Sequence, residues 1–334
     1  MPAEWEPHAA TWLTWPRREG ISFPEIYDRI PPVFAAMVRA ISHHEAVHIN
    51  VWGESMELEA KSVLQEHGAF NKQVYFHHFQ AYEPWARDHG PVFVVNKSSR
   101  AITDWGYNAW GEKYPPYDLD NQIPDQIAKF RTLERFDPKM ILEGGSIEVN
   151  GCGTLLTTES CLLNPNRNPG LSKNEIEQRL RDYLGATNIL WLGKGIAGDD
   201  TDGHVDNLAR FVDPHTILAA VEEDSTDENY VVLKENLKRL HSIKGQDGKP
   251  LSTIELPMPS PLMLKGERLP ASYANFYVTN GSVLVPTYRD KNDAKAIKIL
   301  GELFPDREIV GIDSIDLVWG LGSFHCLTMQ EPKI

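Results

Sequence analysis

Six segments of this chain share one pattern, in which a short polar lead-in is followed by an apolar β-type run or hairpin. They begin near residues 8, 87, 143, 204, 273 and 324, so successive starts are 79, 56, 61, 69 and 51 residues apart. A recurrence of roughly 60–70 residues is typical of a repeated supersecondary module. Five intervals predict five modules, and the sixth segment is then a C-terminal strand that pairs with the first and leaves no free sheet edge.

Helical and β-type periodicity alternates between these lead-ins. The helical ranges are 23–44, 54–67, 119–133, 172–184, 226–242 and 292–304. The β-rich ranges are 47–52, 73–79, 188–193, 252–257 and 307–313. The sequence therefore predicts one α/β domain over residues 1–334, built from about five ββαβ-type modules. The spacing alone leaves open an ordinary open α/β sheet.

Charge and cysteine content limit the partners and the compartment. Lys+Arg 33 against Asp+Glu 47 gives a net charge of −14, whereas nucleic acids and anionic membranes select basic clusters, so we expect neither as a partner. No apolar run reaches membrane-spanning length, and the start lacks the features of a signal peptide. Three cysteines without a Cys-x-x-Cys motif suit free thiols in the cytoplasm. Cys152 and Cys161 are interpreted as small buried residues of a hairpin.

The polar lead-ins carry chemically reactive residue types. They read Trp85-Ala86-Arg87-Asp88, Glu143-Gly144-Gly145, Asp202-Gly203-His204-Val205-Asp206 and His325-Cys326. If the modules surround an axis, these side chains converge on one site. A thiol with its usual pKa of about 8.5 needs a base or a positive neighbour to act as a nucleophile near pH 7.

His204, oriented by Glu143, fits the role of that base for Cys326. Asp88 and Asp206 would allow the site to hold a cation, and a planar guanidinium matches the grip of two carboxylates. We expect both aspartates to be ionised in the resting protein. We also expect Glu143 to keep His204 protonated, and the imidazolium to lower the pKa of the Cys326 thiol.

Other interpretations of these residues are weaker. A calcium loop at 198–209 would place Gly198 and Ala209 where ligands are obligatory, and the histidine pairs at 43–44 and 77–78 lack companions at metal-ligand spacing. We therefore predict no metal. A cysteine peptidase would also use Cys326 and His204, but it has no need of two further carboxylates at the nucleophile. A binding protein without catalysis would carry an unreactive thiol at Cys326.

Five blocks together resemble the agmatine deiminase and peptidyl-arginine deiminase-like family. They are "MPAEWEPHAATWLTWP", "WARDHGPVFV", "LEGGSIEVNGCGTLLTTESCLLNPNRNP", "TDGHVDNLARF" and "FHCLTMQEP", and they occur in order along the whole chain. The resemblance implies a five-bladed α/β-propeller (pentein) fold, closed by the C-terminal strand. It implies hydrolysis of the guanidine group of agmatine to N-carbamoylputrescine and ammonia through a covalent cysteine intermediate.

The resemblance also implies roles for individual residues. Cys326 matches the nucleophile, His204 the general acid/base and Glu143 its carboxylate partner, whereas Asp88 and Asp206 match the carboxylates that hold the guanidinium. We expect Trp85 and Gly145, which lie in the same segments, to contribute to substrate binding. No metal or organic cofactor is implied, the partner is a small cationic guanidino substrate, and a homo-oligomer is compatible with the sequence.

The chain departs from the family pattern near the nucleophile, where it reads Gly320-Leu321-Gly322-Ser323-Phe324-His325, and at Asp202 and Glu148. These departures leave the far end of the substrate open. Another guanidino compound, such as free or peptide-borne arginine, is the alternative substrate.

Overall fold

The strands form five sheets of three or four strands and one separate two-stranded hairpin, in a computed structural model that describes residues 1–334. The sheets, in order of hydrogen-bonded neighbours, are β18 (Met329–Pro332), β1 (His8–Thr14), β2 (Ala46–Asn50) and β3 (Val74–His77); β4 (Val92–Val95), β5 (Arg100–Thr103) and β6 (Glu134–Phe136); β7 (Ile147–Val149), β8 (Thr154–Thr158) and β9 (Asn188–Leu192); β10 (Ala209–Asp213), β11 (Thr216–Val221) and β12 (Ser252–Pro257); and β15 (Tyr277–Val278), β16 (Ser282–Thr287) and β17 (Glu308–Asp313). The hairpin consists of β13 (Met263–Leu264) and β14 (Glu267–Arg268).

All five sheets share one pairing pattern, an antiparallel pair followed by a parallel third strand. In the N-terminal sheet the first strand is supplied by the C-terminus, because β18 pairs antiparallel with β1, and β1 pairs parallel with β2. The predicted pairing of the two ends of the chain is confirmed.

A long helix links the second and third strands of each sheet, as a parallel pair requires. These helices are α1 (Ile30–Ser42), α5 (Ile123–Arg131), α7 (Lys173–Leu184), α8 (Asn229–Ser242) and α9 (Asp293–Leu303), and α2 (Glu54–Glu66) leads to the additional strand β3. All six lie within the predicted helical ranges. In α7, a capping box formed by Ser172 and Glu175 starts the helix, and Gly185, with φ +72°, ends it.

The five predicted β-rich ranges are also strands, but β5, β6 and the short hairpin strands β13 and β14 lie outside every predicted β segment, and β6 illustrates why. Its three residues are all exposed, so it carries no hydrophobic alternation from which a strand could be predicted.

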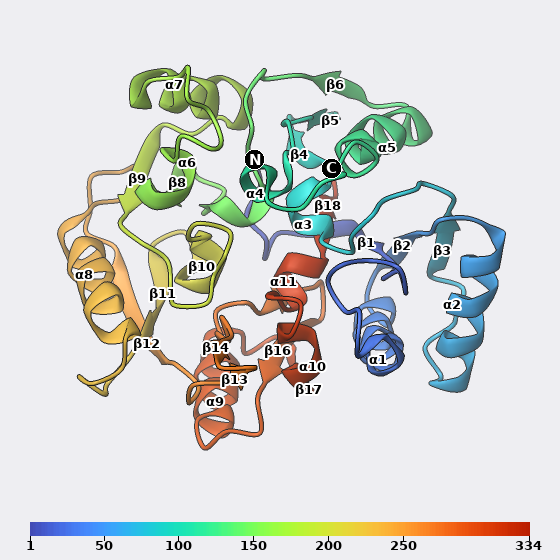
Figure 1. The fold of residues 1–334 in the computed structure, drawn as a ribbon. Helices are drawn as coiled ribbons and strands as arrows, with labels where there is room; N and C mark the ends of the chain where they lie inside the picture. Colours follow the sequence, from blue (N-terminus) through green and yellow to red (C-terminus); the bar gives the residue numbers. More distant parts are fainter.

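Short helical turns precede the first strand of four sheets. They are α3 (Ala86–His89) before β4, η3 (Gly144–Ser146) before β7, η4 (Val205–Asn207) before β10 and α11 (Phe324–Leu327) before β18, and residues 273–274 form a turn before β15. The other short helices are η1 (Tyr27–Arg29), α4 (Ala109–Glu112), η2 (Asp120–Gln122), α6 (Glu159–Leu162) and α10 (Ile315–Val318). Figure 1 shows the long helices at the periphery, with α3 and α11 near the middle.

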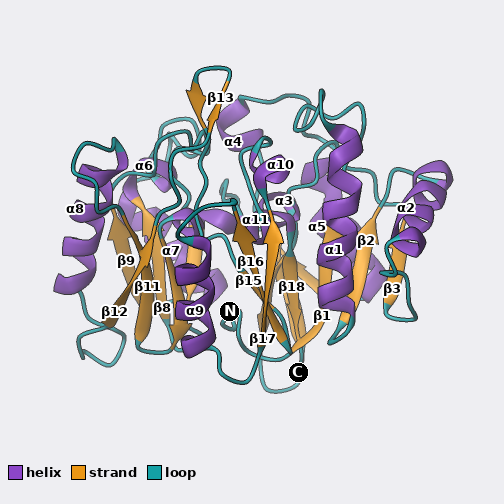
Figure 2. Ribbon diagram, turned by 90° about the horizontal axis from the view of Figure 1, so that it is seen from below, coloured by secondary structure: helices purple, strands orange, loops and turns teal.

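Figure 2 shows α3, α10 and α11 towards the end of the molecule from which β13 protrudes, with the C-terminus at the opposite end. The turns of four polar lead-ins contact one another, because α3 packs against both α11 and η3, and η3 packs against η4. None of the helices combines the length and the apolar character needed to cross a membrane.

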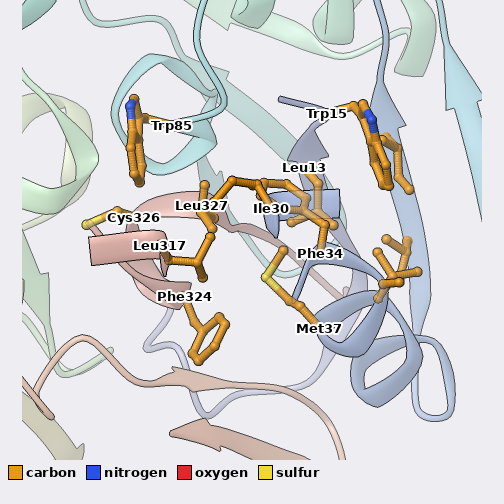
Figure 3. Packing of buried hydrophobic residues seen from close by; sticks show 14 of the residues in the cluster. Leu13, Trp15, Ile30, Phe34, Met37, Trp85, Leu317, Phe324, Cys326 and Leu327 are labelled. Atoms are coloured by element: carbon orange, nitrogen blue, oxygen red, sulfur yellow. The ribbon is translucent and has the colours of Figure 1, made fainter. Parts of the chain in front are cut away.

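Hydrophobic packing holds α11 in place. Phe324 and Leu327 are fully buried in the hydrophobic cluster that contains the buried residues of α1, and Cys326 belongs to the same cluster. In Figure 3, Cys326 lies on the side of α11 away from the α1 residues Ile30, Phe34 and Met37. C-terminal segments are normally frayed, but here α11 is ordered by burial of its side chains and β18 by pairing with β1.

Candidate active site

Gly145 marks the point at which three of the predicted side chains converge. A Cβ atom at this position would lie 2.5 Å from Nδ1 of His204, 2.8 Å from Oδ1 of Asp88 and 3.0 Å from Oδ2 of Asp206. The backbone N–H of Gly145 donates to Oδ1 of Asp88 over 3.0 Å. Only a residue without a side chain fits here, and the structure thus brings together four predicted residues from three segments.

Cys326 joins this group through Asp206 and through a residue that the sequence analysis did not identify. Its Sγ donates to Oδ2 of Asp206 over 3.6 Å and accepts from Nδ2 of Asn275 over 3.1 Å. Oδ1 of Asn275 accepts from the backbone N–H groups of His325 (3.1 Å) and Cys326 (3.3 Å). Asn275 therefore fixes both the thiol and its backbone.

Sequence reasoning could have found Asn275. It occupies the fifth lead-in, just before β15, and the lead-ins before β4, β7, β10 and β18 all supply site residues. The signal that could have identified it is its position within the module, because the residue type alone suggests only a turn.

Each aspartate is held by one side-chain nitrogen. Nε1 of Trp110 donates to Oδ2 of Asp88 over 2.9 Å, and Nδ1 of His325 lies 2.7 Å from Oδ2 of Asp206. These contacts leave Oδ1 of Asp206 without a partner although the residue is fully buried. Unfilled acceptor capacity on a buried carboxylate is suited to a donor that arrives with a ligand.

His204 and Glu143 face each other without a hydrogen bond. Both are fully buried, neither ring nitrogen of His204 has a partner, and the functional atoms of Glu143, Cys161 and His204 all lie within 4.8 Å of one another. Oε1 of Glu143 accepts from Nε of Arg167 over 2.6 Å, whereas Oε2 has no partner. The nearest salt-bridge partner of His204 is Asp88, with 3.7 Å between Nδ1 and Oδ1.

The cysteines differ from the hairpin interpretation. Cys161 is buried as expected, but on α6 and close to His204, whereas Cys152 is exposed in the turn between β7 and β8. The Asn-Gly turn places Cys152 at the tip, where packing cannot reach it, so the prediction that it is buried was wrong.

The Glu143–Cys161–His204 cluster has donor types that a transition metal accepts. Two features oppose a cation there. The Arg167 guanidinium already occupies one Glu143 oxygen, and the pKa of His204 is raised, which keeps a proton on the ring that a metal would have to displace.

Burial and neighbouring charges set the protonation of the site. Burial opposes a charge on His204, but the carboxylate of Asp88, the contact with Cys161 and the charge of Glu143 raise its pKa well above the usual value. Burial and the nearby Asp206 raise the pKa of Asp88 to about 6. Burial also acts on Asp206, but its bond to His325 lowers the pKa below the usual value. Near neutral pH His204 is therefore protonated and both aspartates are ionised, but Asp88 contributes more to the raised pKa of His204 than Glu143, the residue that was predicted to keep it protonated.

The thiol behaves differently from the expectation. Burial first, and then the charges of Asp206 and Asp88, raise the pKa of Cys326 well above its usual value. The prediction that imidazolium lowers this pKa in the resting protein was wrong, because two carboxylates oppose a thiolate in a site of low polarity. A cation placed between the carboxylates and the sulfur would remove that opposition.

A cavity of about 100 Å³ opens onto Cys326 and Asp88. The residues that line it are Ile21, Ser22, Trp85, Asp88, Trp110, Tyr114, Asp200, Thr201, Trp319, Gly320, Leu321, Gly322 and Cys326. The lining contains two carboxylates, three tryptophans and no Lys, Arg or His. Such a wall favours a small, partly apolar cation. His204, Glu143, Asp206 and Gly145 do not line the cavity.

Comparison with known proteins matches this arrangement to one family. The chain matches the family of Porphyromonas-type peptidyl-arginine deiminases over residues 1–332. It is 37% identical over 373 residues to the agmatine deiminase of Medicago truncatula, covering 100% of this chain and 96% of that protein. It is also 37% identical over 356 residues to the agmatine deiminase of Pseudomonas aeruginosa (strain LESB58), covering 99% of this chain and 95% of that protein.

A solved structure of the Enterococcus faecalis agmatine deiminase superimposes with a TM-score of 0.93 at 33% identity, covering 100% of this chain and 95% of that one. The match extends over the whole length and includes every lead-in segment that carries a site residue. The chain therefore belongs to the Porphyromonas-type peptidyl-arginine deiminase family.

Proposed function

We propose that this enzyme hydrolyses the guanidinium group of agmatine to N-carbamoylputrescine and ammonia. The observation that carries the proposal is a thiol 3.6 Å from one buried carboxylate, in a cavity lined by a second carboxylate and by no basic residue. Fixed carboxylates grip a guanidinium through charge-assisted hydrogen bonds, each contributing about 1.5–3 kcal/mol. A peptidase has no comparable use for them.

The proposed fold is a single catalytic domain over residues 1–334 in the form of a five-bladed α/β-propeller. Five sheets with the same strand order and the same connecting helix support it, as does the pairing of β18 with β1. In such a propeller, equivalent lead-ins from successive modules meet at the centre, which explains how side chains hundreds of residues apart form one site.

The contacts support a role for each residue. We assign Cys326 as the nucleophile, His204 as the general acid/base and Glu143 as the carboxylate that supports the imidazolium. Asp88 and Asp206 hold the guanidinium. Trp85 forms one wall of the cavity, close enough that a Cβ at Gly322 would lie 2.5 Å from its ring, and Gly145 leaves the space in which the charged groups meet.

Binding of the substrate cation is proposed to activate the thiol. The resting thiol keeps its proton because Asp206 and Asp88 raise its pKa. When the guanidinium occupies the carboxylates, their charge is neutralised and the thiol releases its proton to solvent. The same cation positions its central carbon next to the sulfur, so activation and orientation occur in one step.

The chemical path then has two halves. The Cys326 thiolate attacks the guanidinium carbon, and protonated His204 gives its proton to the departing nitrogen, which leaves as ammonia and breaks the C–N bond. The product of this half is an amidino cation bound through carbon to Cys326. Neutral His204 next takes a proton from water as the oxygen attacks that carbon. Collapse breaks the C–S bond, restores thiolate and imidazolium, and releases the carbamoyl product, which loses its extra proton to solvent.

Agmatine is favoured over arginine by the charge of the cavity. The far end of agmatine is a single ammonium, whereas arginine carries a carboxylate that would need a basic partner. Asp200 lines the cavity and accepts from the hydroxyl of Tyr114. The cavity wall has no basic residue to pair with a substrate carboxylate.

Ammonia release from agmatine, arginine and a short arginine peptide tests the proposal directly. We expect turnover of agmatine at a rate well above both others, and a Cys326 adduct of the amidino group after acid quenching, detected by mass spectrometry of the Cys326 peptide. Near-normal turnover by Cys326→Ser would exclude the assigned nucleophile. Preference for arginine would exclude the assigned substrate and leave the guanidine chemistry intact.

A further inference from the structure

The carboxylate of Glu4 contacts His325, the residue before the assigned nucleophile, but does not line the cavity. Glu4 is 5% exposed, and its side chain accepts from four donors. Oε2 accepts from Nη2 of Arg87 over 3.0 Å and lies 3.0 Å from Nε2 of His325, whereas Oε1 accepts from Nη2 of Arg210 over 2.8 Å and from the N–H of Val278 over 2.9 Å. A carboxylate with all its acceptor positions filled is held firmly.

The four donors come from four different parts of the fold. Arg87 is on α3, Arg210 on β10, Val278 on β15 and His325 on α11. Two further bonds join these segments, because Nε of Arg87 donates to the carbonyl oxygen of His325 over 3.2 Å and Nη1 of Arg210 donates to the carbonyl oxygen of Phe276 over 2.7 Å. We call Glu4, Arg87, Arg210 and His325 the Glu4 network. It connects the lead-ins that carry Asp88 and Cys326.

His325 links the Glu4 network to the reaction site. Its Nε2 faces Oε2 of Glu4 at 3.0 Å, and its Nδ1 faces Oδ2 of Asp206 at 2.7 Å. An ionised carboxylate only accepts hydrogen bonds, so both ring nitrogens must donate, which makes the ring an imidazolium. Burial opposes the charge on Glu4, but Arg210 and His325 lower its pKa well below the usual value, so Glu4 is ionised.

Without Glu4, a proton on Nδ1 of His325 is enough to satisfy Asp206, and Nε2 no longer needs one. The imidazole ring can then be neutral. The positive charge beside Asp206 is then lost, and Asp206 is the carboxylate that faces both Cys326 and the proposed guanidinium. The charged group that faces His325 from α3 is Arg87, which cannot replace an anion. The positive charge beside Asp206 therefore depends on Glu4, which lies near the N-terminus.

We propose that Glu4 is a positioning residue that keeps His325 doubly protonated and so holds Asp206 and Cys326 in their reactive arrangement. This inference rests on the proposed deimination for its kinetic consequence, but not for its statement about His325.

The kinetic test compares Glu4→Gln with Glu45→Gln, a matched control. Glu45 is also a buried carboxylate, 3% exposed, that accepts from Nδ1 of His8 and from the N–H of Asn280 without touching the site. A shift of about 1 Å at reacting groups lowers rates by roughly 10²-fold, so we expect a loss of this size in kcat/KM for Glu4→Gln. Glu45→Gln should stay within about threefold of wild type at a comparable loss of melting temperature.

The charge of His325 is measured without substrate. Imidazole ¹⁵N signals at pH 7, assigned by their absence from His325→Asn, should show two protonated nitrogens in the wild type and one in Glu4→Gln. A neutral wild-type ring, or a ring unchanged by Glu4→Gln, would overturn the proposal. Because this measurement does not involve agmatine, it remains decisive even if the proposed substrate is wrong.

A second variant covers the case in which Glu4→Gln does not fold. In His325→Asn the amide can still donate to Asp206 but does not span to Glu4, so it should lower kcat/KM by a similar factor. In this background Glu4→Gln should produce little further loss, because the link is already broken. Wild-type turnover by His325→Asn, or full additivity of the two changes, would refute the positioning role.

Discussion

Substitution of Gly145 by alanine tests how closely the charged groups of the site are packed. The new Cβ would lie 2.5 Å from Nδ1 of His204 and 2.8 Å from Oδ1 of Asp88, whereas ordinary van der Waals contact begins near 3.4 Å. His204 must therefore retreat by roughly 1 Å, or Gly145 must move by as much. A misplacement of this size at reacting groups lowers the rate by about 10²-fold.

The effect on stability should be much smaller than the effect on turnover. Overpacking by one methyl group costs about 1–3 kcal/mol, which a domain of this size tolerates with a cooperative melt. We expect Gly145→Ala to show kcat/KM for agmatine reduced at least about 10²-fold and a melting temperature only a few degrees lower. Ammonia release and thermal denaturation followed by circular dichroism measure the two quantities.

Gly170→Ala is the matched control, because an added Cβ at Gly170 has no atom within 4 Å. It should be close to wild type in both measurements. If Gly145→Ala folds and keeps kcat/KM within about threefold of wild type, the convergence of His204, Asp88 and Asp206 on this glycine is not what the reaction depends on, and the assigned geometry is wrong.

Three further predictions concern other parts of the site and fold. Since the pKa of Asp88 is raised to about 6, its charged form is lost as pH falls through that value, so the decline of wild-type kcat/KM with falling pH, which the protonated Cys326 thiol already causes, should steepen by a further factor of about ten per pH unit below pH 6; the same steepening in a residually active Asp88→Asn variant would assign it to another group. Asn275→Ala removes the amide that donates to Cys326 Sγ and accepts from the N–H groups of His325 and Cys326, so it should lower kcat by about 10–100-fold. An unchanged kcat would argue against a positioning role for Asn275. Deletion of residues 329–334 removes β18 and should abolish the cooperative melt or lower the melting temperature by at least about 10 °C. Deletion of the exposed residues 333–334 alone should leave the melting temperature unchanged. If the longer deletion melts at the temperature of the full-length protein, β18 is dispensable.

The secondary structure was largely predictable because its determinants are local. The apolar spacing of Ile176, Leu180 and Leu184 repeats every four residues and predicts the buried face of α7. The recurrence of lead-ins predicted the pairing of β18 with β1, since a strand following the last lead-in has the same local pattern as its counterparts. The edge strand β6 escaped because its residues bury nothing.

Several site residues were predictable only as a set. Asp88, His204, Asp206 and Cys326 are individually unremarkable types, and their position at equivalent points of a repeated module is what identified them. Asn275 occupies the same kind of position and was overlooked because an amide has no titratable charge. Cys161 was predicted to be buried, but its contact with His204 depends on two segments whose distance the sequence does not encode.

By itself, the sequence determined the modules, their helices and strands, and which lead-ins carry reactive side chains, because these properties depend on residues within one segment. The tertiary structure alone decided which charges meet. Glu4 and His325 are separated by almost the whole chain, yet they lie 3.0 Å apart. It also decided the protonation of Cys326, whose pKa is raised because burial removes water while two carboxylates from other modules stand nearby. Desolvation and Coulomb interactions depend on distance in space, so they exist only once the chain has folded.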